Sequence, residues 1–167
     1  MQDLDTTKLC LSCGFCCQGL IFGRAALRSD ELATAVQYGL PYFTFSKRDY
    51  GFTLPCHSYQ NGRCLIYSNR PHACRRYRCH LLKRLATGEI NLQNGLLIVD
   101  HAKGLKDSID KKIANFENGR NFRQKVNNFL DLYCRNPAAF GVSGNEILKE
   151  VKSFYAILHQ YFEQRVV

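Results

Sequence analysis

The sequence predicts an α+β protein, mostly α, in which a cysteine-rich metal-binding module is covered by about three C-terminal helices. Eight of the nine cysteines and most of the turn-forming residues precede Gly88, whereas long segments of helical periodicity follow it. We therefore expect a cysteine-cluster module over residues 1–88 and a helical extension over residues 89–167 that packs on it, within one compact domain. At 167 residues, of which 46% are hydrophobic, the chain is long enough to bury such a core.

The first elements after the N-terminal cysteines are short. Residues 20–22 form an apolar run that predicts a strand. Residues 29–38 predict a helix that opens with Ser29 as the capping hydroxyl and ends at Gly39.

A β-hairpin is predicted in the middle of the module. Residues 42–59 are rich in aromatic and β-branched side chains, which favours extended structure. Asn61-Gly62 is a strong tight-turn signal, so residues 54–59 and 64–67 are expected to form the two arms of the hairpin.

The last element of the module is predicted to be a helix over residues 72–86 that ends at Gly88. Pro71 is suited to be its first residue. Cys74 and Cys79 would lie about 140° apart around its axis. Either the helix starts after Cys74, or the two sulfurs serve different ends of a site.

Apolar residues at helical spacing predict three helices in the second half, which pack on each other and cover the module. The third helix is expected to open with a capping box, Ser143-x-x-Glu146. Cys134 falls on the apolar side of the second helix, which predicts a buried small hydrophobic residue and not a metal ligand. The apolar positions are Ile98, Ala102, Leu105, Ile109, Ile113 and Phe116, then Phe122, Val126, Phe129, Leu130 and Tyr133, then Ile147, Leu148, Val151, Phe154, Tyr155, Leu158, Tyr161 and Phe162.

The composition points to a cytoplasmic protein with metal-bound cysteines. The N-terminus is polar and acidic, unlike a signal peptide, and no apolar run approaches the roughly 18 residues of a membrane span. Clustered cysteines in a reducing compartment bind metals or act in catalysis more often than they form disulfides. The net charge of +9 is a weak indication of a nucleic-acid partner, because metal-bound thiolates would offset part of it.

The strongest functional signal is Cys10-x2-Cys13-x2-Cys16-Cys17. Thiolates two residues apart can turn toward one point, which suits a tetrahedral metal or an iron–sulfur cube. Four further cysteines follow by residue 79. The candidate metal ligands are therefore Cys10, Cys13, Cys16, Cys17, Cys56, Cys64, Cys74 and Cys79.

This ordered set of motifs resembles the CxxCxxCC family of zinc- or iron-chelating proteins, also called YkgJ-like cysteine-cluster proteins. The resemblance covers roughly residues 9–84 and includes Leu54-Pro55-Cys56, Cys64-Leu65-Ile66-Tyr67 and Arg70-Pro71-His72-Ala73-Cys74-Arg75. It implies a bound metal, either zinc or iron. Some relatives are described as flagellin lysine-N-methylases, but nothing in this chain resembles a methyl-donor site. Many members have an aromatic-proline pair after the Cys74-Arg75 motif, whereas this chain continues to Cys79, which makes Cys79 the least secure ligand.

The residues leave the identity and number of the metal centres open. Soft thiolates suit zinc and iron–sulfur clusters equally, and the Cys-x2-Cys-x2-Cys triplet slightly favours a four-iron cluster (4Fe-4S). Adjacent Cys16 and Cys17 point in different directions, so either one of them is not a ligand or eight thiolates hold two centres. His57, His72 and His80 each lie within two residues of a cysteine and are interpreted as surface residues or hydrogen-bond donors in preference to ligands.

We therefore expect a metal-binding protein with an iron–sulfur or zinc centre. If the metal is iron, the expected role is that of a redox or iron-dependent modifying enzyme. The alternative is a non-catalytic zinc module that binds a protein or nucleic acid through the basic segment 70–84. In that segment, Arg70 and Arg75 better suit hydrogen bonding near the metal. Hydrolase and nucleotide-enzyme motifs are absent from the sequence, and no catalytic residue is assigned.

Overall fold

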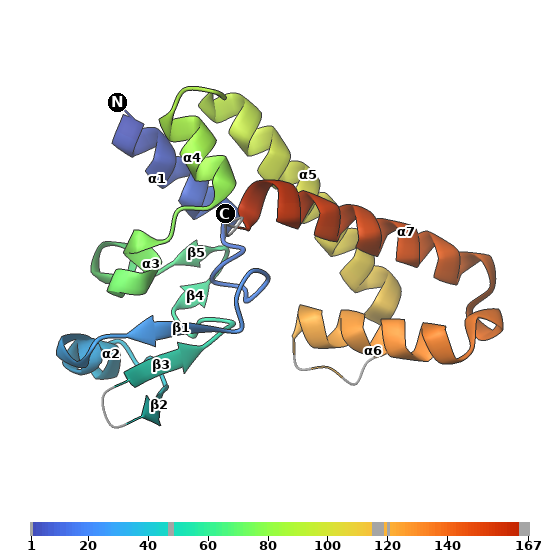
Figure 1. Ribbon diagram of the computed structural model, residues 1–167, viewed down its shortest axis with the longest axis horizontal. Helices are drawn as coiled ribbons and strands as arrows, with labels where there is room; N and C mark the ends of the chain where they lie inside the picture. Colours follow the sequence, from blue (N-terminus) through green and yellow to red (C-terminus); the bar gives the residue numbers. More distant parts are fainter. Residues whose placement is uncertain (1, 47–48, 115–118, 120, 164–167) are drawn as a thin grey trace.

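The computed structural model describes residues 2–46, 49–114, 119 and 121–163. Short helices and strands from the first half of the chain form one end of the molecule, and long helices from the second half extend away from it (Figure 1). The α+β, mostly α fold class is confirmed.

A three-stranded antiparallel sheet lies at the lower end of the module in Figure 1. After helix α1 (Gln2–Cys13) come β1 (Arg24–Leu27), β2 (Tyr42–Ser46) and β3 (Asp49–Thr53), in the spatial order β1-β3-β2. In the register, Ala25 lies opposite Phe52 and Phe43 lies opposite Gly51. The expected extended structure over residues 42–59 is thus present as two paired strands.

The predicted strand over residues 20–22 is wrong, because the strand begins at Arg24. Leu20 instead belongs to the turn that follows α1: its N–H donates to the carbonyl of Phe15 at 3.0 Å. The Leu20 side chain is buried in the core formed by the long helices, so this apolar residue packs in that core and is not part of a strand.

The predicted helix over residues 29–38 is confirmed as the turn η1 (Ser29–Glu31) followed by α2 (Leu32–Gln37). Ser29 is not its cap. The capping residue is Arg28, whose backbone N–H donates to the Glu31 carboxylate at 3.0 Å. Gly39, at φ +62°, follows the end of α2.

The predicted hairpin is also confirmed, with shorter arms. Its strands are β4 (Tyr59–Gln60) and β5 (Arg63–Cys64), which pair in antiparallel register. Asn61 and Gly62 both have positive φ, +50° and +76°, as a tight hairpin turn requires.

The single helix predicted over residues 72–86 is wrong. After the turn η2 (Tyr67–Asn69), the chain forms α3 (His72–Arg76) and α4 (His80–Ala86), with Pro71 as the residue before α3. The break has a tertiary cause. Tyr77 is extended and its hydroxyl donates to the carbonyl of Phe162, while the Cys79 sulfur accepts from the Leu82 N–H at 3.4 Å and caps α4.

The three predicted C-terminal helices are present as α5 (Leu92–Ile113), α6 (Phe122–Arg135) and α7 (Gly141–Ile157). The turn η4 (Pro137–Phe140) precedes α7, and a π-helical turn, η5 (Leu158–Phe162), extends it. The capping-box prediction is wrong, because α7 begins at Gly141 and therefore contains Ser143 and Glu146. Phe116 lies outside the described residues.

The covering of the module by these helices is partial. α5 packs against α1, and η5 packs against α4. α6 packs against α5 and α7 at the end remote from the sheet (Figure 1). Cys134 is exposed on α6, so the prediction that it is buried is wrong.

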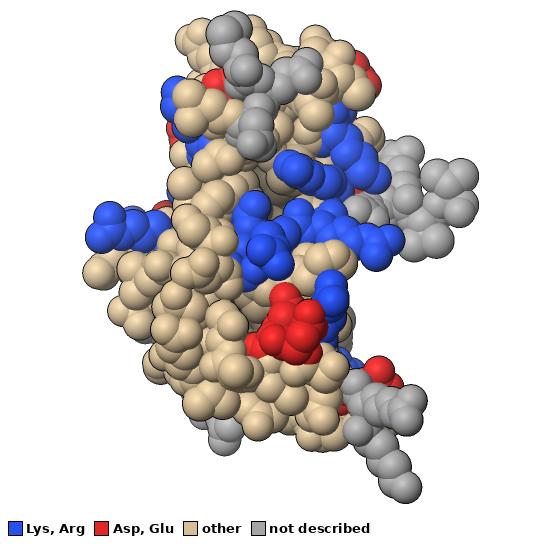
Figure 2. All heavy atoms as spheres, turned by 90° about the vertical axis from the view of Figure 1, so that its left-hand side faces the viewer, with Lys and Arg blue, Asp and Glu red and all other residues tan. Residues whose placement is uncertain are grey.

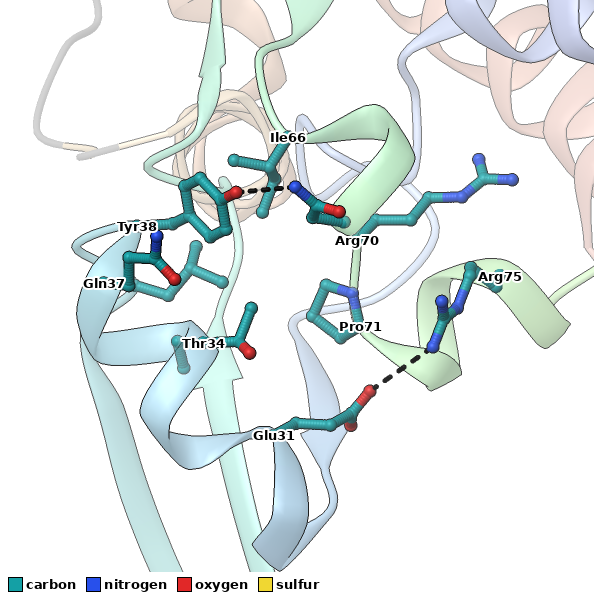
Figure 3. A pocket seen from close by; sticks show the side chains of 11 residues that line it. Glu31, Thr34, Gln37, Tyr38, Ile66, Arg70, Pro71 and Arg75 are labelled. Atoms are coloured by element: carbon teal, nitrogen blue, oxygen red, sulfur yellow. Dashed lines mark hydrogen bonds and ion pairs between the residues drawn. The ribbon is translucent and has the colours of Figure 1, made fainter.

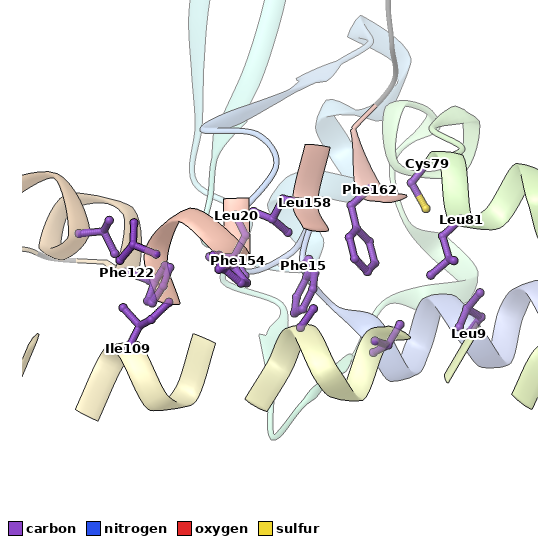
Figure 4. Close-up of a cluster of buried hydrophobic side chains, with 14 of the residues drawn as sticks. Leu9, Phe15, Leu20, Cys79, Leu81, Ile109, Phe122, Phe154, Leu158 and Phe162 are labelled. Carbon is purple, nitrogen blue, oxygen red and sulfur yellow. The ribbon is translucent and has the colours of Figure 1, made fainter. Parts of the chain in front are cut away.

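Two hydrophobic cores result. The larger core joins α1 and α4 to the long helices, and Phe15 lies inside it with ring centroids 4.9 Å from Phe162 and 6.3 Å from Phe154 (Figure 4). The smaller core lies between the sheet, α2 and the segment before η2, and consists of Leu27, Ala35, Leu40, Phe52 and Ile66.

Candidate metal centre

All eight candidate ligands line one cavity of about 330 Å³ between the two cores, here called the thiol chamber. They reach it from four places in the chain. These are α1 with the turn after it (Cys10, Cys13, Cys16 and Cys17), the hairpin region (Cys56 and Cys64), α3 (Cys74) and the start of α4 (Cys79). The ninth cysteine, Cys134, does not line the chamber.

The turn at Gly14 directs the N-terminal cysteines toward the chamber. Gly14 has φ +69°, a conformation that side chains rarely adopt, and it ends α1. A Cβ atom there would also collide with the ring of Tyr59 from β4. The turn places Phe15 in the larger core, while Cys16 and Cys17 face the chamber.

The hairpin region is held directly against this turn. The Cys56 N–H donates to the carbonyl of Cys17 at 2.7 Å. The Cys17 and Cys64 thiols share a hydrogen bond, which raises the pKa of Cys17 and lowers the pKa of Cys64. Cys17, Cys56 and Cys64 are therefore direct neighbours.

Burial keeps most of the other chamber thiols protonated. It raises the pKa of Cys13 to about 12, that of Cys74 to about 12 and that of Cys79 to about 11. Burial is also the main reason that the pKa values of Cys16 and Cys56 are raised. A metal ion must displace these protons when it binds, since the thiolate is the ligating form.

Arg70 brings a positive charge to the chamber. Its Nη1 lies 3.8 Å from the Cys10 sulfur, and its guanidinium stacks on the Tyr67 ring, 3.8 Å from the centroid. Its Nε is buried without a hydrogen-bond partner among the described residues. The contact with Cys10 confirms a hydrogen-bonding role of Arg70 beside the cysteines, and a half-buried guanidinium with a spare donor fits a site that gains thiolate charge. Arg75 instead lies 4.0 Å from the Glu31 carboxylate.

The chamber offers sulfur as its donor, inside a largely apolar wall. None of His57, His72 and His80 lines it, and His80 Nδ1 lies 3.1 Å from the Gln160 carbonyl. Within the described ranges, no three Cys, His, Asp or Glu side chains are arranged to hold a metal ion. The residues fit a zinc or iron–sulfur centre in donor chemistry.

A second cavity of about 320 Å³ adjoins the thiol chamber between α2 and α3 (Figure 3). The two cavities share Ile66, Arg70 and Pro71 as lining residues. Figure 3 shows the Arg70 guanidinium pointing away from this second cavity, whose rim carries a hydrogen bond of 2.6 Å between Asn69 and the Tyr38 hydroxyl. No sequence pattern indicates this cavity, because its walls come from separate segments.

Comparisons with known proteins identify the module. No helix within the described residues has the length and apolar composition needed to cross a membrane. The comparison with curated proteins and the comparison with solved structures each found no match. One family model matches residues 9–96, more than half of the chain and all eight chamber cysteines. The chain belongs to the CxxCxxCC family, described as a "putative zinc- or iron-chelating domain".

Proposed function

We propose that this protein binds metal through the cysteines of the thiol chamber and holds an iron–sulfur or zinc centre there, with iron–sulfur favoured. One observation carries the proposal: eight cysteines from four separate segments line the same cavity. Soft thiolates are the ligands that zinc and iron–sulfur clusters take in proteins. The Cys10-x2-Cys13-x2-Cys16 triplet with one remote cysteine is the pattern that favours a four-iron cluster.

The chain's own residues have distinct tasks in this proposal. The thiols bind the metal and release their protons. The Arg70 guanidinium, which contacts Cys10, offsets part of the thiolate charge, and the apolar wall limits the access of water. When bound, an iron–sulfur cluster would supply one-electron transfer for a redox or iron-dependent modifying role, whereas zinc would supply a structural cross-link.

Metal analysis with an absorption spectrum, on protein purified without oxygen, tests the proposal. A brown sample with broad visible absorption and about four irons and four sulfides per chain is the result expected for an iron–sulfur centre. A colourless sample with one or two zinc ions per chain would retain metal binding and overturn the preference for iron. Protein that contains neither metal and does not take either up after reduction would overturn the proposal itself.

A second candidate function, binding of a polyanionic partner, rests on the surface charge. Lys and Arg side chains gather in a band across one face of the module, next to a smaller group of acidic side chains (Figure 2). Several arginines of segment 70–84 are already engaged within the molecule: Arg70 at Cys10, Arg75 at Glu31 and Arg84 at Glu89. This reduces the charge that the segment can offer to nucleic acid.

Retention on heparin at increasing salt tests this second function. A nucleic-acid binder that makes several phosphate contacts loses affinity steeply as the salt concentration rises. Elution near physiological salt, with no difference between the wild type and the exposed-residue variant Arg76→Gln, would exclude it.

A further inference from the structure

We infer that the thiol chamber holds two separate metal centres, one formed by Cys10, Cys13, Cys16 and Cys79 and the other by Cys17, Cys56, Cys64 and Cys74. The inference rests on the proposed function, metal binding by these thiols, and goes beyond it by assigning each cysteine to a centre. The first set is called the helix set and the second the hairpin set.

The helix set lies against the larger core. Cys10 and Cys13 occupy the last turns of α1, three residues apart and hence on one face of the helix. Cys79 is part of the larger core, and both α1 cysteines pack against that core. Cys16 lines the chamber together with these three cysteines. Its pKa is raised mainly by burial and next by the neighbouring thiols Cys13, Cys79 and Cys10.

The hairpin set lies against the smaller core. Cys56, Cys64 and Cys74 all pack against it. Cys17 joins them through its hydrogen bond to Cys64 and through the bond from the Cys56 N–H to its carbonyl. The thiols that act on Cys74 most strongly are Cys56 and Cys64.

The two sets meet at the adjacent residues Cys16 and Cys17, which both line the chamber. This division explains why the motif contains two adjacent cysteines, which a single mononuclear centre would not use together. Each tetrathiolate is the ligand count that a zinc ion or a four-iron cluster requires.

Arg70 stands at the boundary between the sets. It contacts Cys10 of the helix set. Its charge also favours the thiolate forms of Cys64 and Cys74 in the hairpin set, although the hydrogen bond with Cys17 is the main cause of the lowered pKa of Cys64 and burial is the main cause of the raised pKa of Cys74. Two tetrathiolate centres, each of net charge −2 with zinc, would otherwise repel each other across a cavity of low polarity. A shared guanidinium reduces that repulsion.

Titration of the reduced, metal-free full-length chain with Co²⁺ under anaerobic conditions tests the assignment. Thiolate-bound Co²⁺ absorbs in the visible range, so occupancy can be counted directly. The wild type is expected to bind about two Co²⁺ per chain in tetrahedral thiolate sites. The double variants Cys13→Ser/Cys79→Ser and Cys56→Ser/Cys74→Ser are each expected to lose one tetrahedral site and retain the other. Cys134→Ser, which changes the exposed ninth cysteine, is the matched control and should retain both.

A second measurement does not depend on how the variants fold. Wild-type protein with one equivalent of Zn²⁺ is alkylated with N-ethylmaleimide and the modified cysteines are identified by fragmentation mass spectrometry. In chains that carry a single Zn²⁺, selected by native mass spectrometry before fragmentation, the four protected cysteines are expected to belong to one set.

The outcomes separate this inference from the proposed function. Saturation of the wild type at one metal ion, or chains with a single bound metal ion whose four protected cysteines come from both sets, would overturn the division into two centres while leaving metal binding intact. Absence of Co²⁺ and Zn²⁺ binding, together with absence of iron in the protein as purified and after reconstitution, would overturn the proposed function as well. Loss of both sites in either double variant, with wild-type helical content by circular dichroism, would show one shared centre.

Discussion

The larger and the smaller core are stabilised in different ways. In the larger core, aromatic rings fill the space between helices: Phe15, Phe129 and Phe154 are each 0% exposed. The smaller core contains five buried residues and adjoins a cavity of about 330 Å³ whose wall carries thiols. Close-packed apolar side chains stabilise a fold without assistance, whereas a thiol-lined cavity gains its cross-links when metal binds. The thiol chamber adjoins both cores, but the smaller core has five buried residues of its own, so we expect the stability of the sheet end to depend on metal more than that of the long helices.

The largest expected effect comes from metal removal. Binding of a structural metal contributes roughly 10–16 kcal/mol to small metal-dependent folds. We expect chelation of the metal-loaded protein to abolish amide hydrogen-exchange protection in the sheet, the hairpin and α3, while amides of α5 and α7 keep theirs. Unchanged protection across the module after verified metal loss would contradict this.

Truncation of a ring in the larger core is expected to have the next largest effect. Phe154→Ala should lower the free energy of unfolding by about 3–5 kcal/mol, because it leaves a cavity among Phe15, Phe122 and Tyr155. Denaturant unfolding measures the change, and the metal content per folded chain should stay the same. The matched control is Val142→Ala at a side chain that is 77% exposed, where the change should stay within about 0.5 kcal/mol.

Two glycine substitutions should have opposite signs in the two regions. Gly14→Ala should destabilise the protein by about 1–3 kcal/mol and lower metal occupancy, because φ is +69° and the new methyl group meets Tyr59. Gly104→Ala lies in α5, where a Cβ meets nothing within 4 Å. It should stabilise the protein by about 0.5–1 kcal/mol with unchanged metal content. Equal effects of the two substitutions in thermal unfolding would argue against a special role of the Gly14 turn.

The last prediction concerns metal affinity and Arg70. Arg70→Met removes the charge and the contact with Cys10. Residues around a metal centre typically contribute at least about tenfold to metal affinity, so the variant should bind metal at least about tenfold more weakly. Competition with a chelator of known affinity measures this change. Arg76→Met, at an exposed residue of the same helix region, is the control and should bind metal like the wild type. If both variants bind equally, Arg70 does not compensate thiolate charge.

Local sequence signals predicted the elements whose causes are local. Asn61-Gly62 is sufficient to specify the hairpin, and the periodic apolar residues specify the three long helices. The cysteine spacing pointed to a metal site, and the structure brings all eight candidate residues to one chamber, although their role as ligands stays a prediction.

The wrong predictions share a tertiary cause. The helix over residues 72–86 is broken where Tyr77 bonds to Phe162, a contact across 85 residues that is not visible in a window of sequence, and Cys79 then caps α4 locally. Leu20 serves a core built mainly by helices about a hundred residues away. The inward direction of Arg70 and the approach of Tyr59 to Gly14 likewise depend on how distant segments meet.

X-ray absorption spectroscopy of the metal in the protein as purified tests the central claim most directly, because it identifies the ligand atoms. The account predicts a first shell of sulfur alone, four per metal, at about 2.3 Å for zinc. A first shell dominated by nitrogen or oxygen would contradict it, since the thiols of the chamber would then not be the ligands.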